Sequence, residues 1–376
     1  MNRLSVVIAG GGVAALEALL RLRRLADDRV SIRLLAPNED FAYRALSVGE
    51  PFSLGAAERH PLAPMVAHAD AEWVKDTLRS VDPERRVVHT GGGEELPFDA
   101  LVVAVGVRSH AVIDHARTFD DAHADELLRG LVQDIEGGYV TKVAFVSPPG
   151  PVHPLPLYEL ALMAAQNAYD AGVNDFEVDL ITAEPRPLPA FGAQVGAVVG
   201  DLLSEAGIRV HTSTEVKVPS KGHLVLSPSG TELTVNSIVA LPQLTGPSVG
   251  GIPGRGAHGF IPVDSQCAVP GTDRRVFVVG DAMDFPVKQG GVGAQAADVA
   301  SAAIARAAGS EVDVPSFRPV VQGKLLTGAG PKYLFARYIG GEGFDATITD
   351  LPPEGSDRKV AAAELAPYLE HAAAAI

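Results

Sequence analysis

The residues best placed to do chemistry begin with three consecutive glycines near the start of the chain. Gly10, Gly11 and Gly12 follow an apolar run at residues 4–8 and precede residues 13–24, whose apolar positions recur at helical spacing. A turn between a buried strand and a helix leaves backbone N–H groups that can bind a phosphate, and a side chain would block the ligand's approach. We therefore expect a dinucleotide-type phosphate site, formed by Gly10, Gly11, Gly12, Val13, Ala14 and Ala15.

Two later segments share the pattern of an apolar run that ends at a glycine. Residues 99–105 lead to Gly106, and residues 276–279 lead to Gly280 and Asp281. Any one of these motifs alone is also compatible with a tight structural turn. Taken together they predict one cofactor site, to which these two segments contribute Ala104, Val105, Gly106, Gly280 and Asp281.

One expected part of such a site is missing. A dinucleotide fold usually carries a carboxylate at the end of its second strand, about 20 residues after the glycine turn, where it binds the adenosine ribose. Here the second strand, residues 30–35, is followed by Ala36. Asn38 or Glu39 can substitute, and either is equally compatible with a solvated turn residue.

Length and composition limit the classes of protein. A chain of 376 residues favours two domains and a tail, and 47% hydrophobic with 20% charged residues fits a packed globular enzyme. The net charge of −15 disfavours nucleic acid as a partner, because phosphate backbones repel such a surface. A first strand that starts by residue 4, and the lack of any apolar run of about 20 residues, predict a cytoplasmic protein without a transmembrane segment.

The cysteine count excludes two further classes. Cys267 is the single cysteine, so an intrachain disulfide and a Cys-rich metal site are both ruled out. No cluster of His, Asp or Glu has the spacing of metal ligands, and we expect no metal.

Strand and helix signals alternate through residues 1–330, which predicts an α/β fold. We expect two nested Rossmann-like three-layer domains and a small C-terminal tail. The expected division is 1–112 and 253–330 for the first domain, 113–252 for the inserted domain, and 331–376 for the tail. Within these, residues 40–68 are expected to form a long loop, and residues 359–375 a helix that packs on the body or on a partner subunit.

Set side by side, residues 10–15, 98–106 and 276–281 resemble the motifs of two-dinucleotide-domain flavoproteins in the pyridine nucleotide-disulfide oxidoreductase superfamily. The similar branch contains sulfide:quinone oxidoreductases, flavocytochrome c sulfide dehydrogenase flavoprotein subunits and type II NADH dehydrogenases. The resemblance covers about residues 4–335. It implies an FAD/NAD(P)-binding fold, noncovalent FAD in the first domain, and a hydrogen bond that Asp281 accepts from a ribityl hydroxyl.

Residues 181–185 and 323–328 resemble the sulfide:quinone oxidoreductases more than the NADH dehydrogenases. The chain also departs from both. The sulfide enzymes use cysteines near the flavin, and Cys267 here is expected to be a small core residue.

The inserted domain departs in its nucleotide loop. It shows Pro148-Pro149-Gly150-Pro151 where a nicotinamide-binding loop would carry glycines, and Thr182 where the acidic ribose ligand would stand. Glu184 lies two residues further on, and it is also compatible with a surface charge at the strand end. NAD(P)H is therefore not favoured as the donor, although an atypical nucleotide site stays open.

Catalytic candidates lie beside the expected flavin. The resemblance places Lys288, Gln289 and Gly290 below the ring, where a helix start and a lysine would stabilise negative charge on the reduced flavin. His153 and Glu159 are candidate proton donors. A solvated lysine, an ordinary loop histidine and a helix-capping glutamate are the corresponding alternatives.

The remaining binding candidates come from the segments that would lie over the cofactor. In the resembling family the loop after the second strand covers the flavin, which makes Tyr43 and Arg44 candidates there, while Leu78 is a candidate adenine contact and Asn38 a candidate ribose ligand.

These observations predict an FAD-dependent oxidoreductase that passes electrons from an unidentified small-molecule donor to a quinone or similar acceptor. One alternative is an NAD(P)H dehydrogenase with an atypical nucleotide site. Another is a flavin-bearing binding or assembly subunit without turnover. A homodimer is compatible with the sequence but is not indicated by any motif in it.

Overall fold

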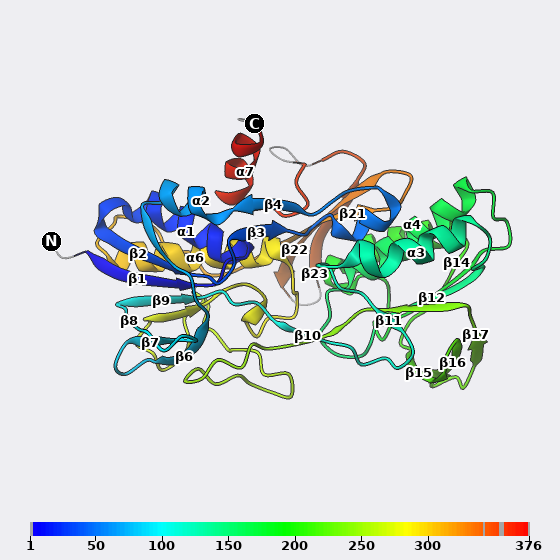
Figure 1. Cartoon of the computed structure of the whole chain (residues 1–376), viewed down its shortest axis with the longest axis horizontal. Helices are drawn as coiled ribbons and strands as arrows, with labels where there is room; N and C mark the ends of the chain where they lie inside the picture. The colour runs from blue at the N-terminus through cyan, green and yellow to red at the C-terminus, as the bar shows by residue number, and fades with distance from the viewer. Residues whose placement is uncertain (1–2, 341–342, 353–356, 375–376) are drawn as a thin grey trace.

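The computed structural model describes residues 3–340, 343–352 and 357–374. It is an elongated molecule with one parallel sheet in each half (Figure 1).

The first sheet brings together strands from both ends of the sequence. All its neighbouring strands are parallel, in the order β20-β9-β1-β2-β5. The strands are β1 (Leu4–Ala9), β2 (Val30–Leu35), β5 (Ala71–Val74), β9 (Ala100–Val103) and β20 (Val276–Val278). The apolar runs predicted from the sequence form its centre, where Val6, Val7 and Ile8 are fully buried, as expected for a sheet covered on both faces.

Helices cover one face of this sheet and a small antiparallel sheet covers the other (Figure 1). The helices are α1 (Val13–Ala26) and α6 (Gly290–Ala307), which lie side by side. The small sheet consists of β6 (Leu78–Asp82), β7 (Val87–Thr90) and β8 (Glu95–Pro97). The half is therefore a three-layer unit.

The second half repeats this arrangement. Its parallel sheet has the order β11-β18-β12-β13-β14, and alternate residues of each strand face opposite layers. Val143 and Phe145 pack on the helices, while Ala144 and Val146 pack on an antiparallel sheet. The strands are β11 (Arg117–Thr118), β12 (Lys142–Val146), β13 (Glu177–Ile181), β14 (Ile208–His211) and β18 (Ser237–Ala240); the helices are α3 (Ala124–Glu136), α4 (Leu155–Asp170) and α5 (Gly192–Glu205); the antiparallel strands are β15 (Glu215–Ser220), β16 (His223–Ser227) and β17 (Glu232–Thr234).

Two short antiparallel strands connect the halves. The chain leaves the first half through β10 (Arg108–His110) and returns through β19 (Gln243–Thr245). This path confirms the predicted fold class, in which one Rossmann-like unit interrupts another. The exact domain boundaries stay a prediction.

The C-terminal part packs on both halves. An antiparallel sheet of β21 (Val320–Leu326), β22 (Pro331–Gly340) and β23 (Gly343–Thr349) contacts α4 and α5. Helix α7 (Leu365–Ala374) contacts α1. Because β21 and β22 pair across residue 330, a single sheet spans the expected border between core and tail.

Two local predictions differ from the structure. Residues 40–68 are not one long loop but contain β3 (Asp40–Tyr43), the 3₁₀ segment η2 (Ser47–Phe52), β4 (Glu58–Pro61) and α2 (Leu62–His68). Residues 359–364, expected to be helical, precede the helix, because side chains from distant elements hold them in place, as described below.

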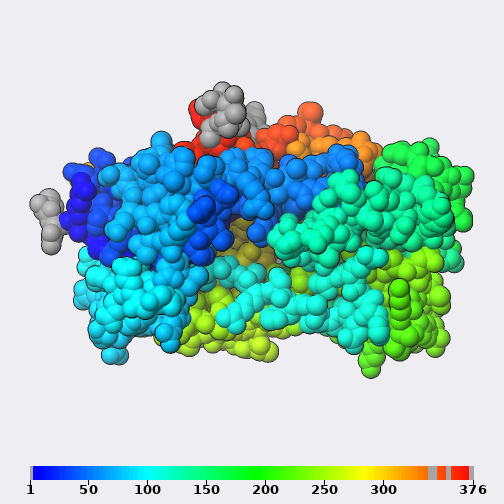
Figure 2. All heavy atoms as spheres, viewed as in Figure 1, coloured from blue at the N-terminus to red at the C-terminus, as the bar shows by residue number. Residues whose placement is uncertain are grey.

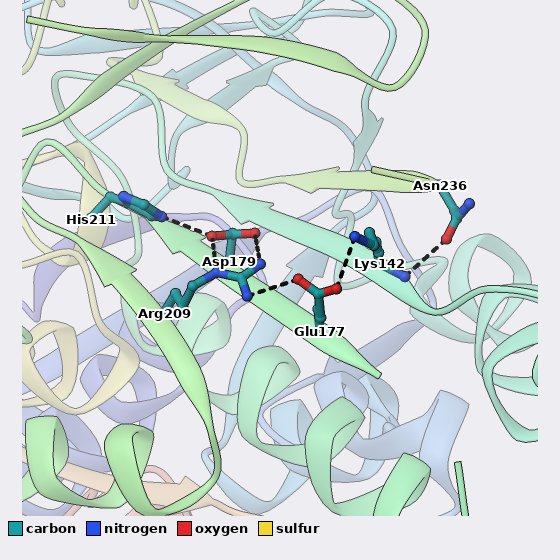
Figure 3. A network of polar contacts seen from close by, with 6 residues as sticks. All are labelled: Lys142, Glu177, Asp179, Arg209, His211 and Asn236. Atoms are coloured by element: carbon teal, nitrogen blue, oxygen red, sulfur yellow. Dashed lines mark hydrogen bonds and ion pairs between the residues drawn. The ribbon is translucent and has the colours of Figure 1, made fainter. Parts of the chain in front are cut away.

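A charged network crosses the second sheet (Figure 3). Asp179 is 3% exposed and accepts two hydrogen bonds from Arg209, at 3.0 and 2.8 Å, and contacts His211 at 2.8 Å. Glu177, which is more exposed, links Arg209 to Lys142. Burial would raise the pKa of Asp179, but the bonds from Arg209 and His211 outweigh it and hold the pKa below its usual value.

Asp179→Asn should therefore lower the free energy of unfolding by about 2 kcal/mol at neutral pH, because it removes the buried acceptor of Arg209. The stabilisation by Asp179 should be present above about pH 4 and be lost as the pH falls through its folded pKa. Urea unfolding measures both effects. The matched control Glu177→Gln, at the exposed end of the network, should cost less than about 0.5 kcal/mol, and equal losses would contradict the assignment.

Candidate functional site

A cavity of about 680 Å³ opens between the two halves of the molecule. Figure 2 shows it as a recess near the centre of the view, between the blue atoms of the N-terminal segments and the teal atoms of the second half. Several of the residues expected to bind or react line it: Gly12, Val13, Tyr43, Arg44, His153, Asp281, Lys288, Gln289 and Gly290. The structure thus brings together residues up to 278 positions apart, from Gly12 to Gly290.

The glycine turn has the geometry that a close ligand needs. Gly10 has φ +132°, and a Cβ placed on it would lie 2.2 Å from the carbonyl oxygen of Ala104, so no larger residue fits. A Cβ on Gly12, by contrast, would have no heavy atom within 4 Å. The turn is therefore tight towards the sheet and open towards the cavity.

Two helices begin at this cavity without a capping side chain. The N-cap residues are Gly12 for α1 and Gln289 for α6, neither makes a side-chain cap, and neither first turn contains an acid. Helix starts of this kind leave N–H donors and a partial positive charge for an anion. Two such starts on one cavity fit a cofactor that carries phosphates together with an electron-rich ring.

A buried lysine reinforces this positive character. Lys288 is 3% exposed, donates a hydrogen bond to the carbonyl of Met283, and lies over the ring of Phe260 at 3.5 Å from its centroid. Burial lowers the pKa of Lys288 to about 8, against the opposing effect of Asp281 and Asp284. Lys288 is therefore mostly charged at neutral pH, and it is not the solvated lysine that the sequence left open.

Gln289 adds an acceptor. Its side-chain amide Nε2 donates a hydrogen bond to the carbonyl of Gln322, while its Oε1 is buried with no hydrogen-bond partner in the described part of the chain. An unpartnered buried acceptor on a cavity wall fits a ligand that donates a hydrogen bond there. The wall residues thus fit a bound flavin nucleotide.

A buried ion pair between Glu159 and Lys359 lies on the side of the cavity formed by the C-terminal part of the chain. Glu159 of α4 is fully buried and binds Lys359 at 2.6 and 2.8 Å, and it also accepts the N–H of Leu326 at 3.0 Å. Burial raises the pKa of Glu159, and Lys359 and the N–H of Leu326 oppose the shift. Glu159 does not line the cavity, whereas its partner Lys359 does.

Lys359 was not among the residues predicted from the sequence. It belongs to a segment, residues 357–364, that we call the strap. The N–H of Val360 bonds to the hydroxyl of Tyr43 at 3.0 Å, and Arg358 pairs with Glu58 at 3.2 Å. Because the partners lie 200 or more residues away, no local pattern could have indicated this wall.

His153 lies on the cavity near Lys359. Burial, followed by the charge of Lys359, lowers the pKa of His153 to about 4. The imidazole is therefore neutral at physiological pH. It can donate one hydrogen bond and accept another, but it is not an acid in the imidazolium form.

The remaining expected residues are not among those that line the cavity. Several are buried around it and Asn38 is exposed, and their contacts with a cofactor stay predictions: Gly10, Gly11, Ala14, Ala15, Asn38, Leu78, Ala104, Val105, Gly106 and Gly280. Glu39, the alternative ribose ligand, pairs with Lys75 at the surface.

Comparison with known proteins decides the family. The profile of the pyridine nucleotide-disulphide oxidoreductase family matches residues 4–131 and 158–309. The chain belongs to this family. Its members are flavoprotein oxidoreductases, and the resemblance inferred from the glycine motifs is confirmed.

Two curated relatives are similar in sequence. The sulfide-quinone reductase of Aquifex aeolicus (strain VF5) is 26% identical over 265 residues, which cover 65% of this chain and 59% of the relative. The mitochondrial sulfide:quinone oxidoreductase of Dictyostelium discoideum is 30% identical over 109 residues, 28% of this chain and 24% of the relative. The chain thus aligns with less than two thirds of either relative.

Solved structures share the fold. The sulfide:quinone oxidoreductase of Aquifex aeolicus gives a TM-score of 0.81 at 21% identity and covers 98% of this chain and 89% of that one. A ferredoxin reductase of Rhodopseudomonas palustris gives 0.63 at 20% identity, with 92% and 88% covered. An NAD-dependent persulfide reductase of A. fulgidus gives 0.64 at 20% identity, with 90% and 64% covered.

The second Rossmann-like unit of this family member offers no comparable phosphate site. Helix α4 has Pro154 as its N-cap and Pro156 in its first turn, and the N–H of Leu157 already bonds to Pro154. Glu184 accepts a hydrogen bond from the buried hydroxyl of Tyr158 at 2.6 Å. The residues at this edge therefore do not fit a second dinucleotide bound in the usual way.

The cysteine of this chain lies away from the cavity. Cys267 is fully buried, and burial with the nearby Asp264 raises the pKa of its thiol to about 12. It is therefore a core residue, as predicted, and cannot supply a thiolate to the cavity.

A second cavity, of about 370 Å³, lies beyond the strap. Its wall combines apolar and aromatic residues of the C-terminal sheet, such as Phe335 and Tyr333, with the cations Lys324 and Lys359. Lys359 lines both cavities, so the strap is the partition between them.

Among the described residues, no three His, Cys, Asp or Glu side chains lie close enough together to hold a metal ion. Within the same part of the chain, every helix is too short or too polar to cross a bilayer.

The open face of Gly12 can be tested directly. Gly12→Ala places a methyl in open space, so the melting temperature should stay within about 2 °C of the wild type while FAD affinity falls at least about tenfold, or about 1.4 kcal/mol. Flavin fluorescence titration and thermal unfolding measure the two quantities. The matched variant Gly10→Ala should instead destabilise the fold, and full FAD affinity in Gly12→Ala would show that the turn does not contact the cofactor.

Proposed function

We propose that this chain is an FAD-dependent oxidoreductase that passes electrons from a small-molecule donor to a quinone or similar acceptor. The observation that carries the proposal is the convergence of two uncapped helix starts and the buried Lys288 on one cavity. Membership of a flavoprotein family supports the same assignment.

FAD bound in this cavity would accept two electrons from the donor and return them to the acceptor. The protein's part is to bind, orient and set the potential. The start of α1 would hold the pyrophosphate, Asp281 a ribityl hydroxyl, and the start of α6 with Lys288 the electron-rich edge of the ring. Gln289 would accept a hydrogen bond through its free Oε1.

Proton handling would fall to the strap wall. His153 is neutral and faces the cavity, so it can pass a proton by accepting on one ring nitrogen and donating from the other. Glu159 is a positioning residue, because it acts only through its ion pair with Lys359, whose Nζ lies 2.6 Å from Oε1 of Glu159. Lys359 supplies charged N–H donors to both cavities.

The acceptor is proposed to be a quinone on two grounds. The second cavity pairs apolar walls with cationic donors, which suits a ring with an apolar body and carbonyl oxygens. The relatives in both comparisons are named sulfide-quinone reductase or sulfide:quinone oxidoreductase.

The donor is proposed to react without a protein thiol and without a nucleotide cradle. The cavity has no cysteine, and the proline-rich start of α4 offers few N–H groups for a dinucleotide. The donor is thus a small reduced molecule that reaches the flavin directly.

Anaerobic stopped-flow mixing of the FAD-loaded protein tests this assignment. Sulfide or a low-molecular-weight thiol should bleach the flavin at least about tenfold faster than NADH or NADPH, and a water-soluble quinone should restore the colour. Faster bleaching by NADH or NADPH would identify the alternative dehydrogenase. A yellow protein that none of these reagents reduces would identify a subunit without turnover, and a protein that refuses FAD would overturn the proposal.

Lys288→Met should lower the two-electron reduction potential of bound FAD by about 30 to 60 mV, equivalent to about 1.4 to 2.8 kcal/mol, because a buried positive charge is lost. Since the pKa of Lys288 is about 8, the difference from the wild type should shrink above pH 8 as the lysine loses its proton. Dye-coupled redox titration measures the potential. Lys217→Met, at an exposed lysine of β15, is the control, and equal potentials in the two variants would remove Lys288 from the mechanism.

A further inference from the structure

A carboxyl group is buried where the C-terminal helix meets the body of the protein. Glu17 of α1 is 0% exposed. Its two oxygens accept the N–H groups of Glu364 at 2.9 Å and Leu365 at 2.7 Å. These N–H groups stand at the start of α7, where a helix has no partners of its own, so Glu17 caps α7 from another helix.

Four further charged groups surround this carboxyl. Asp298 of α6 faces it, Arg21 of α1 pairs with Asp298 at 3.4 Å and with Glu364 at 2.8 Å, and Arg24 pairs with Glu364 at 2.7 Å. Three acids therefore meet two arginines. The cluster is neutral only when Glu17 and Asp298 hold one proton between them.

The rest of the interface is apolar or aromatic. Leu365 and Leu369 of α7 are each 1% exposed, and the ring of Tyr368 packs against His68 of α2 with centroids 5.2 Å apart. His68 is the titratable group that α2 presents to this helix.

Helix α7 anchors the strap. Lys359 and Val360 of the strap line the main cavity. Val360 also packs against Gly290 at the start of α6, because a Cβ added to Gly290 would lie 3.2 Å from a methyl carbon of Val360. Val360 lies five positions before Leu365, the first residue of α7. Loss of the α7 contact would therefore free the C-terminal end of the strap, whereas the bonds of Lys359 to Glu159 and of Val360 to Tyr43 would still hold its other end.

We propose that Glu17 is a positioning residue: through the first turn of α7 it holds the strap, with Lys359 and Val360, in the wall of the main cavity, and it does so with one proton shared between Glu17 and Asp298. This hold is a property of the fold. Its effect on the cofactor rests on the proposed function.

The proposal has a defined pH dependence. Burial, followed by the charge of Asp298, raises the pKa of Glu17 from 4.5 to about 8, against the opposing effect of the two N–H groups. When α7 leaves, Glu17 meets water and its pKa returns towards 4.5. The docked state thus binds more protons than the undocked state. The equilibrium constant for docking should therefore fall by up to about tenfold per pH unit between pH 4.5 and about pH 8, and stay constant above about pH 8.

Hydrogen exchange of the full-length protein measures docking. The protection of the amides of residues 364–369 is compared with that of α5 in the same sample, so that the intrinsic effect of pH on exchange cancels. In the wild type this ratio should fall at least about tenfold from pH 6 to pH 8 and then level off. A ratio that does not change with pH would overturn the shared proton.

Glu17→Gln separates the proton from the hydrogen bonds. The amide keeps one acceptor for an N–H group and a donor for Asp298, so docking should stay within about tenfold of the wild type at pH 6 and lose its pH dependence. Glu17→Ala should lose docking at every pH. A Glu17→Gln variant with the wild-type pH profile would overturn the assignment, even if the fold is intact.

Asp298→Asn supplies a second, independent variant. It removes the facing charge, so the pKa of Glu17 should fall and the pH dependence should shrink at least about threefold. Glu205→Gln, at an exposed position at the end of α5, is the control and should behave as the wild type.

The flavin gives a separate readout. The rate at which FAD leaves the loaded protein should rise together with the exposure of α7 in Glu17→Ala and should be unchanged in Glu205→Gln. If the exchange results hold but FAD is not bound at all, the proposed function fails and the docking role of Glu17 stands. If FAD binds and α7 exchange is insensitive to Glu17, the docking role fails alone.

Discussion

The structure depends on the close approach of two helix starts. Helices α1 and α6 come from opposite ends of the first half in sequence, yet both begin at the same cavity. Their contact is possible because the residues between them are small: a Cβ on Gly293 would lie 2.9 Å from the Cα of Gly280, and one on Gly280 would lie 3.2 Å from the Cβ of Ala14. Larger residues here would separate the helix starts, and their positive ends would no longer act on one ligand.

The parts that sequence could predict are those set by local chemistry. The apolar runs that become β1, β9 and β20, the glycine that must turn after β1, and the helix that follows are each specified within about ten residues. The order of such segments then predicts the nested fold. Lys288 was indicated by the family resemblance together with its position just before the glycine-rich start of α6.

The parts that sequence could not predict are set by contacts between distant residues. The strap lacks helical structure because Lys359 binds Glu159 and the N–H of Val360 binds Tyr43, 200 and 317 residues away. Residues 40–68 form ordered elements because β3 pairs with β4 and because η2 packs on α3 and α4. Nothing in the composition of either segment distinguishes it from an ordinary loop or an alanine-rich helix.

The two halves show why the fold alone does not determine the activity. Both have a five-stranded parallel sheet and a helix that follows its glycine-containing turn. In the first half, the helix start is open, and the turn gives N–H groups to the cavity. In the second half, prolines remove or restrict the N–H groups at the helix start. The hydroxyl of Tyr158 donates a hydrogen bond to the carboxylate of Glu184. The helix start of one half is thus open to the cavity, whereas the other half contributes His153 to the wall of the same cavity.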